Sequence, residues 1–443
     1  MEVDIISRET IKPCSPTPLP LKTIKLSFLD QLIPPFYTPL ILFYPAIGNN
    51  KVEINLFLSI LKTSLSKALP RYYPLAGRIS DHFSISCNDE GAFYSETRIH
   101  SRIHEFLESS NLESLNRLLP FQPFVKQLYP SVPQVAVQAN IFECRGLAIG
   151  VCMLHKIIDA VTMSNFLTTW ATIARGCAEE FHTDFHAGSS LFPPRDQLPD
   201  EYSSAMDKGW FMEGRYVTRR FVFDPKAIHI LKDRARSENI ANPTRYEVLS
   251  SFIWKHAMAA SRAASKSPKL SVSIDSVDTR SRMEEPLSRN TIGNLLWSAT
   301  SGFESARTEI GLSDLVTMTR ESIRKINGNY FKTLQVDQGC SMIYNGIKLM
   351  LENFSQESPD SFGFSSWCNL GYRETDFGWG KPVWVGIWGG EASPFRNLVI
   401  FLETQSGLGI EAWMTLDEHI LSALEGDDEF LAFTLPNPSI PSA

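Results

Sequence analysis

The clearest hydrophobic pattern in the chain is an apolar run from Leu147 to Leu154 that stops abruptly at His155. A run of this length is typical of a strand that is buried on both faces. From Asp159 to Arg175 the apolar residues fall at the three- and four-residue intervals of a helix, and Asp159 stands where a carboxylate favours a helix N-terminus. The pattern therefore predicts that a strand delivers His155 to a strand-to-helix elbow.

Two interpretations of this elbow compete. A histidine at a strand end is more often a satisfied polar residue, and Asp159 then only caps the helix. Alternatively, His155 is a general base that is held outside the packed core. The short His-x-x-x-Asp match favours the first interpretation when it is taken alone, and the rest of the chain favours the second.

Periodic segments on both sides of the elbow predict a mixed order of strands and helices. A strand at 135–143 forms a hairpin with the apolar run. The periodicity disappears after Asp184, which predicts an α/β fold of two domains, 1–183 and 216–443, joined by a crossover at 184–215. The other predicted helices are 52–69, 104–119, 225–237, 245–264, 312–326 and 417–424, and the other main predicted strands are 218–223, 270–277, 398–402 and 410–414.

Composition and charge exclude several function classes. The net charge of -7 over 443 residues leaves no basic face to displace counterions from phosphates, so we expect no nucleic-acid partner. The N-terminus lacks the apolar core of a secretory signal, and no run reaches the length of a membrane span. The seven scattered cysteines include no Cys-x-x-Cys pair, which favours reduced thiols. We therefore expect a cytoplasmic monomer with no membrane partner.

Motifs for several other chemistries are missing. The sequence has no Gly-x-Ser-x-Gly elbow, no P-loop and no Gly-x-Gly-x-x-Gly turn after a strand, which argues against serine hydrolases and nucleotide enzymes. Two pairs, His100/His104 and His182/His186, have a spacing that can grip zinc on a helix. Neither pair carries the glutamate of a His-Glu-x-x-His site, so we expect no metal.

The least chance-like stretch in the chain is DFGWGKP at 376–382. Two glycines that flank a tryptophan indicate a tight backbone bend that buries aromatic rings. Asp376 could add charge to a site, but a carboxylate beside such turns more often caps backbone amides. A structural role is therefore the expected one from the residues alone.

Taken together, these motifs resemble those of the plant BAHD acyltransferases, CoA-dependent enzymes of specialised metabolism. The resemblance covers the whole chain in the family's order, and it implies two similar domains related to chloramphenicol acetyltransferase. Each would be a mixed sheet with flanking helices, and together they would enclose a solvent channel. The matching segments are SPTP at 15–18, LDQ at 29–31, YPLAGR at 73–78, HKIID at 155–159, RSRM at 280–283, Gly293-Asn294 and DFGWG.

The resemblance also implies roles for single residues. His155 matches the family's general base, and Asp159 matches a carboxylate that pairs with an arginine, here Arg280, to support the catalytic loop. Asp376 heads the second family motif and is carried as a second catalytic candidate, although that motif is thought to lie away from the channel. In SSWCNLGYRETDFGWG, Ser365 and Trp367 match channel positions near the developing oxyanion.

These residues predict a direct acyl transfer. A neutral imidazole, with an ordinary pKa of about 6.5, can take the proton of a hydroxyl while its oxygen attacks an acyl thioester. Hydrogen-bond donors such as Ser365 and Trp367 can stabilise the oxyanion, by about 3 kcal/mol for one donor in other enzymes. The segments SPTP, LDQ and CNDEG resemble the branch that acetylates alkaloid or terpenoid alcohols. We therefore predict O-acetylation of a bulky, largely apolar alcohol in a ternary complex, with acetyl-CoA as co-substrate and no permanently bound cofactor.

Two alternatives stay open. The chain could be a non-catalytic member of the same fold that acts as a scaffold or binds a ligand, although the intact His155 argues against this. It could also transfer the acyl group to an amine or to water, which the mass of the product distinguishes.

Overall fold

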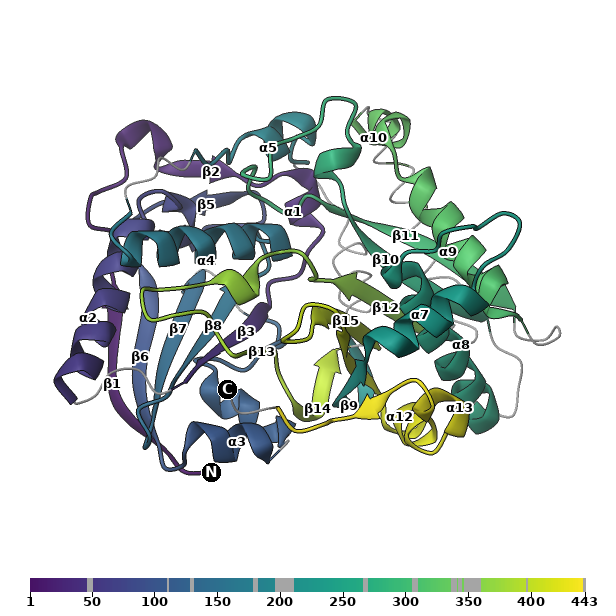
Figure 1. Ribbon diagram of the computed structural model, residues 1–443. Coiled ribbons are helices and arrows are strands. Elements are labelled where there is room, and N and C mark those ends of the chain that lie inside the picture. The colour runs from purple at the N-terminus through teal and green to yellow at the C-terminus, as the bar shows by residue number, and fades with distance from the viewer. Residues whose placement is uncertain are drawn as a thin grey trace.

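Two mixed β-sheets, one built mainly from each half of the chain, form the body of the protein (Figure 1). The computed structural model describes residues 1–45, 51–109, 111–127, 131–177, 182–195, 211–265, 270–304, 310–335, 341, 345, 360–395 and 397–440. Both sheets contain parallel and antiparallel neighbours and carry helices, so the predicted α/β class is confirmed.

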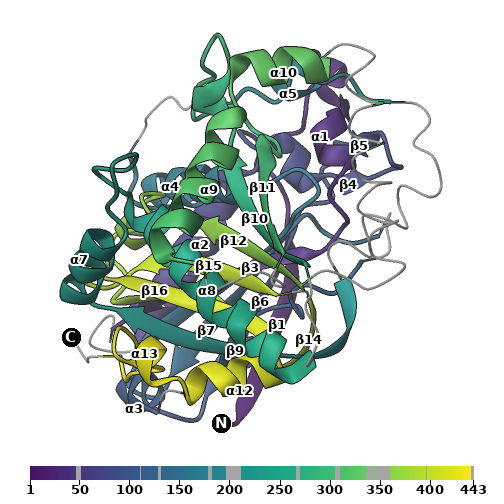
Figure 2. The ribbon, with the colours of Figure 1, turned by 90° about the vertical axis from the view of Figure 1, so that its right-hand side faces the viewer.

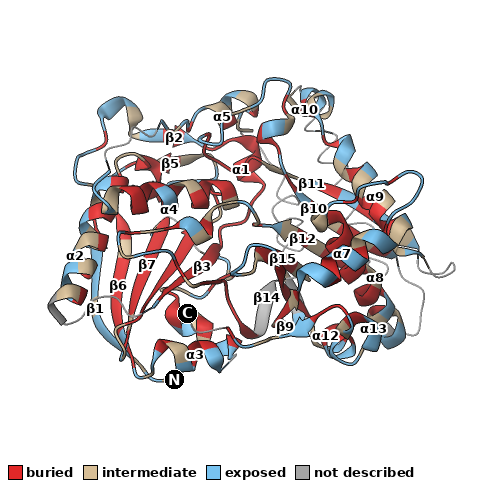
Figure 3. Ribbon diagram, viewed as in Figure 1, coloured by how far each residue is buried: buried red, intermediate tan, exposed pale blue. Residues whose placement is uncertain are grey.

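The N-terminal sheet has the strand order β1-β6-β7-β8-β3-β13. The predicted apolar strand is β8 (Leu147–Leu154), and it is buried at every position, as the red strands of this sheet in Figure 3 illustrate. Strands pair with both of its edges. Its neighbours are β7 and β3. The other strands of this sheet are β1 (Val3–Ile11), β3 (Tyr37–Tyr44), β6 (Ala92–Ile99), β7 (Val135–Phe142) and β13 (Trp384–Gly386).

Helix α4 (Ala160–Ala174) runs across one face of this sheet and packs against α2 (Lys51–Ala68), as Figure 1 shows. The two strongly periodic helices of this half are therefore confirmed. No helix in the described ranges is long and apolar enough to cross a membrane. The shorter elements are η1 (Leu19–Leu21), α1 (Phe28–Gln31), η2 (Tyr73–Ala76), α5 (Ala187–Leu191) and a small sheet of β2 (Thr23–Lys25), β5 (Ser84–Ser86) and β4 (Arg78–Ile79).

The helical stretch predicted at 104–119 is present as two separate segments and not as one helix. The structure has a short α3 (Ile103–Glu108) followed by a 3-10 segment, η3 (Leu112–Leu118). Asn111 caps the second segment by accepting a hydrogen bond from the Ser114 amide at 3.2 Å. An asparagine side chain that bonds the following backbone starts a new segment and does not continue the old one.

The C-terminal sheet has the order β11-β10-β12-β15-β16-β9-β14, and β17 also pairs with β9. Figure 2 shows α8 and α9 in front of its strands, with α7 to their left. The strands are β9 (Phe211–Phe223), β10 (Leu270–Asp278), β11 (Leu296–Glu304), β12 (Asp360–Ser366), β14 (Gly390–Phe395), β15 (Leu398–Glu403), β16 (Ile410–Asp417) and β17 (Leu435–Pro436). The helices are α7 (Pro225–Arg234), α8 (Arg245–Ser265), η4 (Arg280–Arg282), α9 (Leu312–Lys325), α10 (Gly328–Gln335), η5 (Tyr372–Glu374), α12 (Glu418–Glu425) and α13 (Asp428–Leu431).

The two sheets do not follow the domain boundaries that were predicted from the sequence. Strand β9 already begins at Phe211, within the segment that was expected to be crossover, 184–215. Strand β13, from within 216–443, pairs with β3 at the edge of the N-terminal sheet. A three-residue strand carries no periodic signal of its own, because its conformation comes from the edge that it completes. The C-terminal half therefore contributes directly to the N-terminal sheet.

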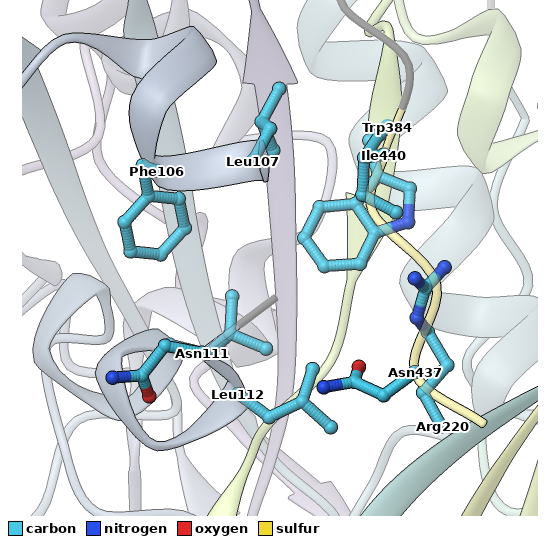
Figure 4. A pocket seen from close by; sticks show the side chains of 9 residues that line it. Phe106, Leu107, Asn111, Leu112, Arg220, Trp384, Asn437 and Ile440 are labelled. Atoms are coloured by element: carbon cyan, nitrogen blue, oxygen red, sulfur yellow. The ribbon is translucent and has the colours of Figure 1, made fainter. Parts of the chain in front are cut away.

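The C-terminal segment also bridges the two halves. β17 pairs with β9, and the Ile440 amide donates to the Leu107 carbonyl on α3 at 3.2 Å. Arg220, 2% exposed, forms a 3.0 Å ion pair with Glu411 at the same place. Figure 4 shows most of the small pocket that these elements line, whose residues are Phe106, Leu107, Asn111, Leu112, Leu115, Arg220, Trp384, Asn437 and Ile440.

Candidate active site

His155 follows the last residue of β8, and its backbone is held from two sides. Its amide donates to the Phe36 carbonyl at 2.8 Å, next to β3. Its carbonyl accepts a 2.8 Å hydrogen bond from Nδ2 of Asn294, a residue of the C-terminal half. The histidine therefore lies where the two halves of the chain meet, at the predicted strand-to-helix elbow.

The helix after the elbow begins as predicted. Asp159 is the N-cap of α4, and its Oδ1 accepts from the Thr162 amide at 2.8 Å. The carboxylate also accepts from the Leu295 amide at 3.2 Å. Asp159 is thus bound to a residue of its own helix and to the C-terminal half at once, which orients the start of α4.

Arg280 is the cationic partner of Asp159. Its Nη1 lies 2.7 Å from Asp159 Oδ2 and its Nη2 lies 3.2 Å from Oδ1, the two-pronged geometry that a guanidinium forms with a carboxylate. Asp159 is 4% exposed and Arg280 is 1% exposed. The guanidinium also donates to the carbonyls of Thr291 and Gly293. The contact expected between these two residues is present, and it joins the halves.

The protonation state of His155 follows from its burial. Burial disfavours the charged imidazolium and lowers the pKa of His155 below 6.5, although Asp159 and the side chain of Asn294 act in the opposite direction. The Phe36 ring lies beside the imidazole, with 5.1 Å between the ring centroids. At neutral pH the imidazole is therefore uncharged and able to accept a proton.

Phe36, which lies beside this histidine, belongs to a cluster of aromatic side chains. Phe36 contacts Phe124 and Phe211, with ring centroids 5.7 Å and 5.9 Å apart, and Phe124 contacts Trp388 at 4.4 Å. Phe211 and Trp388 come from the C-terminal half. The sequence analysis did not identify any of these four residues, because single phenylalanines in a chain with 28 of them carry no local signal. Through Phe36, the histidine adjoins an aromatic cluster to which both halves contribute.

Ser365 and Trp367, the oxyanion candidates, lie at the end of β12. Ser365 is half-buried in the strand, and Trp367 is 6% exposed just beyond it. The Trp367 ring lies 5.8 Å from that of Tyr372, whose hydroxyl donates to the Ala160 carbonyl in the first turn of α4 at 2.7 Å. The structure therefore connects Trp367, through Tyr372, to the helix that starts at the elbow.

Asp376 is not beside His155. Its Oδ1 accepts from the amides of Gly378 and Gly380 at 2.7 and 2.9 Å, and its carbonyl accepts from Arg175. Arg175 is the C-cap of α4, whereas the elbow precedes its N-terminus, and a helix of 15 residues is about 22 Å long. The structure thus corrects the expectation that Asp376 belongs with His155 in the reaction. Its side chain shapes the DFGWG turn, and Gly378 and Gly380 adopt positive φ there.

Lys156, next to the histidine, is 3% exposed, and its ammonium donates to the carbonyls of Gln31 and Ile33 at 3.0 and 2.7 Å. It fastens the elbow to the segment around α1 and does not present a charge to a ligand. In the first of the two histidine pairs with a zinc-like spacing, Nε2 of His100 forms a 2.7 Å hydrogen bond with the Asp4 carboxylate. Within the described ranges, no three His, Cys, Asp or Glu side chains gather as metal ligands would.

The sequence of this chain is similar to those of known transferases. Residues 1–431 match the model of the Transferase family. Akuammiline synthase 2 of Alstonia scholaris is 37% identical over 99% of this chain and 98% of its own length. A limonoid 7-O-acetyltransferase of Citrus sinensis is 38% identical, with 99% of each chain covered. The BAHD acyltransferase BIA1 of Arabidopsis thaliana is 33% identical, again over 99% of each chain.

Solved structures show the same fold. The crystal structure of vinorine synthase superposes with a TM-score of 0.82 and 32% identity over 98% of each chain. A complex of F. graminearum TRI101 with coenzyme A and T-2 mycotoxin superposes with a TM-score of 0.71 at 17% identity, over 94% of this chain and 99% of that one. The second likeness concerns the fold alone.

Proposed function

Because the chain belongs to the BAHD family of acyltransferases, we propose that it transfers an acetyl group from acetyl-CoA to a hydroxyl of a specialised-metabolite alcohol. The observation that carries the proposal is the place of His155 at the junction of the two halves, where burial lowers its pKa below the usual value. The reaction requires the acceptor hydroxyl and the thioester to meet beside one base. Residues of both halves are hydrogen-bonded to the backbone of His155.

The proposed reaction needs no enzyme nucleophile. The imidazole accepts the proton of the acceptor hydroxyl while the oxygen attacks the thioester carbon, and the carbonyl π electrons move to oxygen. The tetrahedral oxyanion then collapses, the C–S bond breaks, and the CoA thiolate recovers the proton from the imidazolium. We assign oxyanion stabilisation to Ser365 or Trp367, since each offers a donor at the end of β12.

The remaining site residues have supporting roles in this proposal. Asp159 and Arg280 hold the start of α4, and thereby the elbow, through their buried ion pair. Asp376 shapes the DFGWG turn at the other end of α4. The cysteines described in the structure are free thiols, which supports a reducing compartment such as the cytoplasm. We further propose that the protein acts as a monomer.

Two observations support an apolar alcohol as the acceptor. Phe36, which lies beside His155, belongs to an aromatic cluster with Phe124, Phe211 and Trp388, and such side chains suit a ligand with a large apolar body. Limonoid 7-O-acetyltransferase, 38% identical to this chain, is named for acetylation of a terpenoid hydroxyl. Both observations favour a terpenoid or alkaloid alcohol over a small polar acceptor.

The test is a panel of acyl-CoA donors and natural-product alcohols with the purified protein. We expect thiol release with acetyl-CoA and a product heavier by one acetyl group, both lost in His155→Ala. His100→Ala is the matched control, because His100 lies at the surface beside Asp4. Transfer that survives in His155→Ala contradicts the assignment of the base. An amide product supports N-acylation instead, and ligand binding without turnover supports a non-catalytic role.

A further inference from the structure

The chain just after β12, residues 367–372, passes from the C-terminal half of the molecule to the N-terminal half. Phe364, in the strand itself, is 0% exposed and packs in the core of the C-terminal half. Trp367 and Tyr372, which are 6% and 3% exposed, pack instead in the cluster that forms the core of the N-terminal half. The Trp367 amide still donates to the Phe401 carbonyl on β15 at 2.9 Å. The 367–372 segment is therefore anchored in one half and buried in the other.

Two hydrogen bonds attach this segment to helix α4. The Tyr372 hydroxyl donates to the Ala160 carbonyl at 2.7 Å, and the Ser164 hydroxyl donates to the Leu370 carbonyl. Ala160 and Ser164 are four positions apart, so they lie on the same face of the helix. The segment therefore lies along one face of the first turns of α4, directly after the elbow.

The Tyr372 side chain joins this helix to Trp367. Burial, and after it the charge of Asp159, raises the pKa of Tyr372 well above its ordinary value, so the hydroxyl keeps the proton that it donates. The ring centroids of Tyr372 and Trp367 lie 5.8 Å apart, a normal packing distance for an aromatic pair. Because a phenol ring is rigid, the two contacts together fix how far the Trp367 indole lies from the start of α4.

The helix end of this link is itself fixed. Ala160 directly follows Asp159, whose buried carboxylate is paired with Arg280. The Ala160 carbonyl therefore has a constant place relative to the elbow that carries His155. The Tyr372 hydroxyl is bonded to that carbonyl, so it ties the indole to the same reference point.

We propose that Tyr372, supported by Ser164, is a positioning residue that holds the Trp367 indole at a fixed place relative to His155. This inference rests on the proposed function, and within it on Trp367 as the oxyanion donor. The base takes the acceptor proton while the oxyanion forms on the thioester carbon, so both groups are needed at once. An oxyanion donor stabilises the transition state most when its place is set before the substrates arrive.

The decisive variant is Tyr372→Phe, which removes one oxygen atom and keeps the ring. Complete loss of one oxyanion donor lowers kcat about 100-fold to 1,000-fold in other enzymes. A donor that is present but poorly held should lose part of this, so we expect kcat to fall at least about tenfold. The KM values for acetyl-CoA and the alcohol should stay within about twofold, because the lost interaction belongs to the transition state.

Tyr44→Phe is the matched control. Tyr44 is also fully buried, and its hydroxyl donates to a carbonyl of the other half, that of Thr375, at the same distance of 2.7 Å. It holds β3 to the start of the DFGWG turn and not α4 to Trp367. We expect both variants to lower the melting temperature by similar amounts, and Tyr44→Phe to leave kcat within about twofold.

A second measurement asks whether Tyr372 acts through Trp367. Trp367→Phe removes the indole N–H, and Tyr372→Phe is then introduced into this background. If Tyr372 only positions the indole, its substitution should change kcat by less than about twofold there. A purely structural role would give the same fold-loss of kcat in both backgrounds.

The place of the indole is also read without substrate, from the indole N–H signals of protein labelled with 15N-tryptophan. Trp367→Phe assigns the signal. We expect it to shift and broaden in Tyr372→Phe and to stay unchanged in Tyr44→Phe; since the phenyl ring is kept, a shift reports movement of the indole. If the wild-type protein transfers no acyl group, the proposed function fails, and these signals still decide whether Tyr372 holds Trp367.

An unmoved Trp367 signal or an unchanged kcat in Tyr372→Phe overturns the proposal. An equal effect in Tyr44→Phe, or the same fold-loss of kcat in the Trp367→Phe background, also overturns it. If Tyr372→Phe does not fold, Ser164→Ala takes its place, because it releases the segment from α4 at the other attachment. An unmoved indole signal in Ser164→Ala then overturns the proposal.

Discussion

The ion pair between Asp159 and Arg280 offers a direct test of how the elbow is held. Asp159→Asn preserves the helix cap, since asparagine caps as well as aspartate, but it removes the charge opposite the guanidinium. Arg280 is then left with Asp278, at 3.0 Å, as its carboxylate partner. The Asp278 side chain is 45% exposed, so it compensates the buried cation only in part.

The expected cost follows from burial. Removing one partner of a buried pair costs about 3–5 kcal/mol, and the contact with Asp278 puts this case at the lower end, at about 3 kcal/mol. For a folding unit of about 200 residues this lowers the melting temperature by about 6–12 °C. A displaced elbow also moves the base, and a shift of about 1 Å can cost on the order of a hundredfold in rate.

The assay is a double-mutant cycle of Asp159→Asn, Arg280→Met and the double variant, measured by thermal unfolding and by kcat. The double variant should lose less stability than the sum of the single variants, because it leaves no buried charge unpaired. Glu411→Gln is the control, since it breaks another buried pair, with Arg220, away from the elbow. It should lower the melting temperature and leave kcat within about twofold. Additive losses of stability, or an equal loss of kcat in Glu411→Gln, would refute the reasoning.

Three further predictions concern the base and the DFGWG turn. Because burial lowers the pKa of His155 and the neutral ring is the base, kcat/KM should be full at neutral pH and fall only as pH drops through a value below 6.5; a midpoint above 6.5 contradicts this. Phe36→Ala admits water to the ring, so this acidic limb should move up toward 6.5, and an unmoved limb excludes desolvation as the cause. Asp376→Ala frees the Gly378 and Gly380 amides and should cost about 1–3 kcal/mol in unfolding by urea, with kcat of the folded protein within a few-fold. A hundredfold loss of kcat at unchanged stability would instead indicate that Asp376 takes part in the reaction.

The elements with a strong local signal were predictable. β8 has the predicted bounds because all eight of its positions are buried, and α4 begins one residue after the carboxylate that caps it. β1 was missed because it is an edge strand that is largely exposed, so its sequence mixes polar and apolar residues. The place of β13 at the edge of the N-terminal sheet could not be predicted, because its partner β3 lies far away in sequence.

The candidate site likewise contains features that could be predicted from the sequence and features that could not. The position of His155, the cap Asp159 and the contact with Arg280 were expected, the last from a family resemblance and not from any local pattern. The hydrogen bonds that Asn294 makes with Asp30 and with the His155 carbonyl were not expected, although Asp30 and Asn294 lie in motifs that were noticed. They are 264 positions apart, and a single sequence contains nothing that states which distant polar groups meet.

The elbow is assembled from both halves, and this constrains how the protein can work. The His155 carbonyl is bound by Asn294, and the Asp159 carboxylate by Arg280 and the Leu295 amide, all from the C-terminal half. These contacts are buried, so none of them exchanges easily with water. The base therefore has its geometry only while the two halves are docked. It follows that a change which undocks the two halves removes catalysis as well as stability, because it abolishes the arrangement in which the imidazole is held.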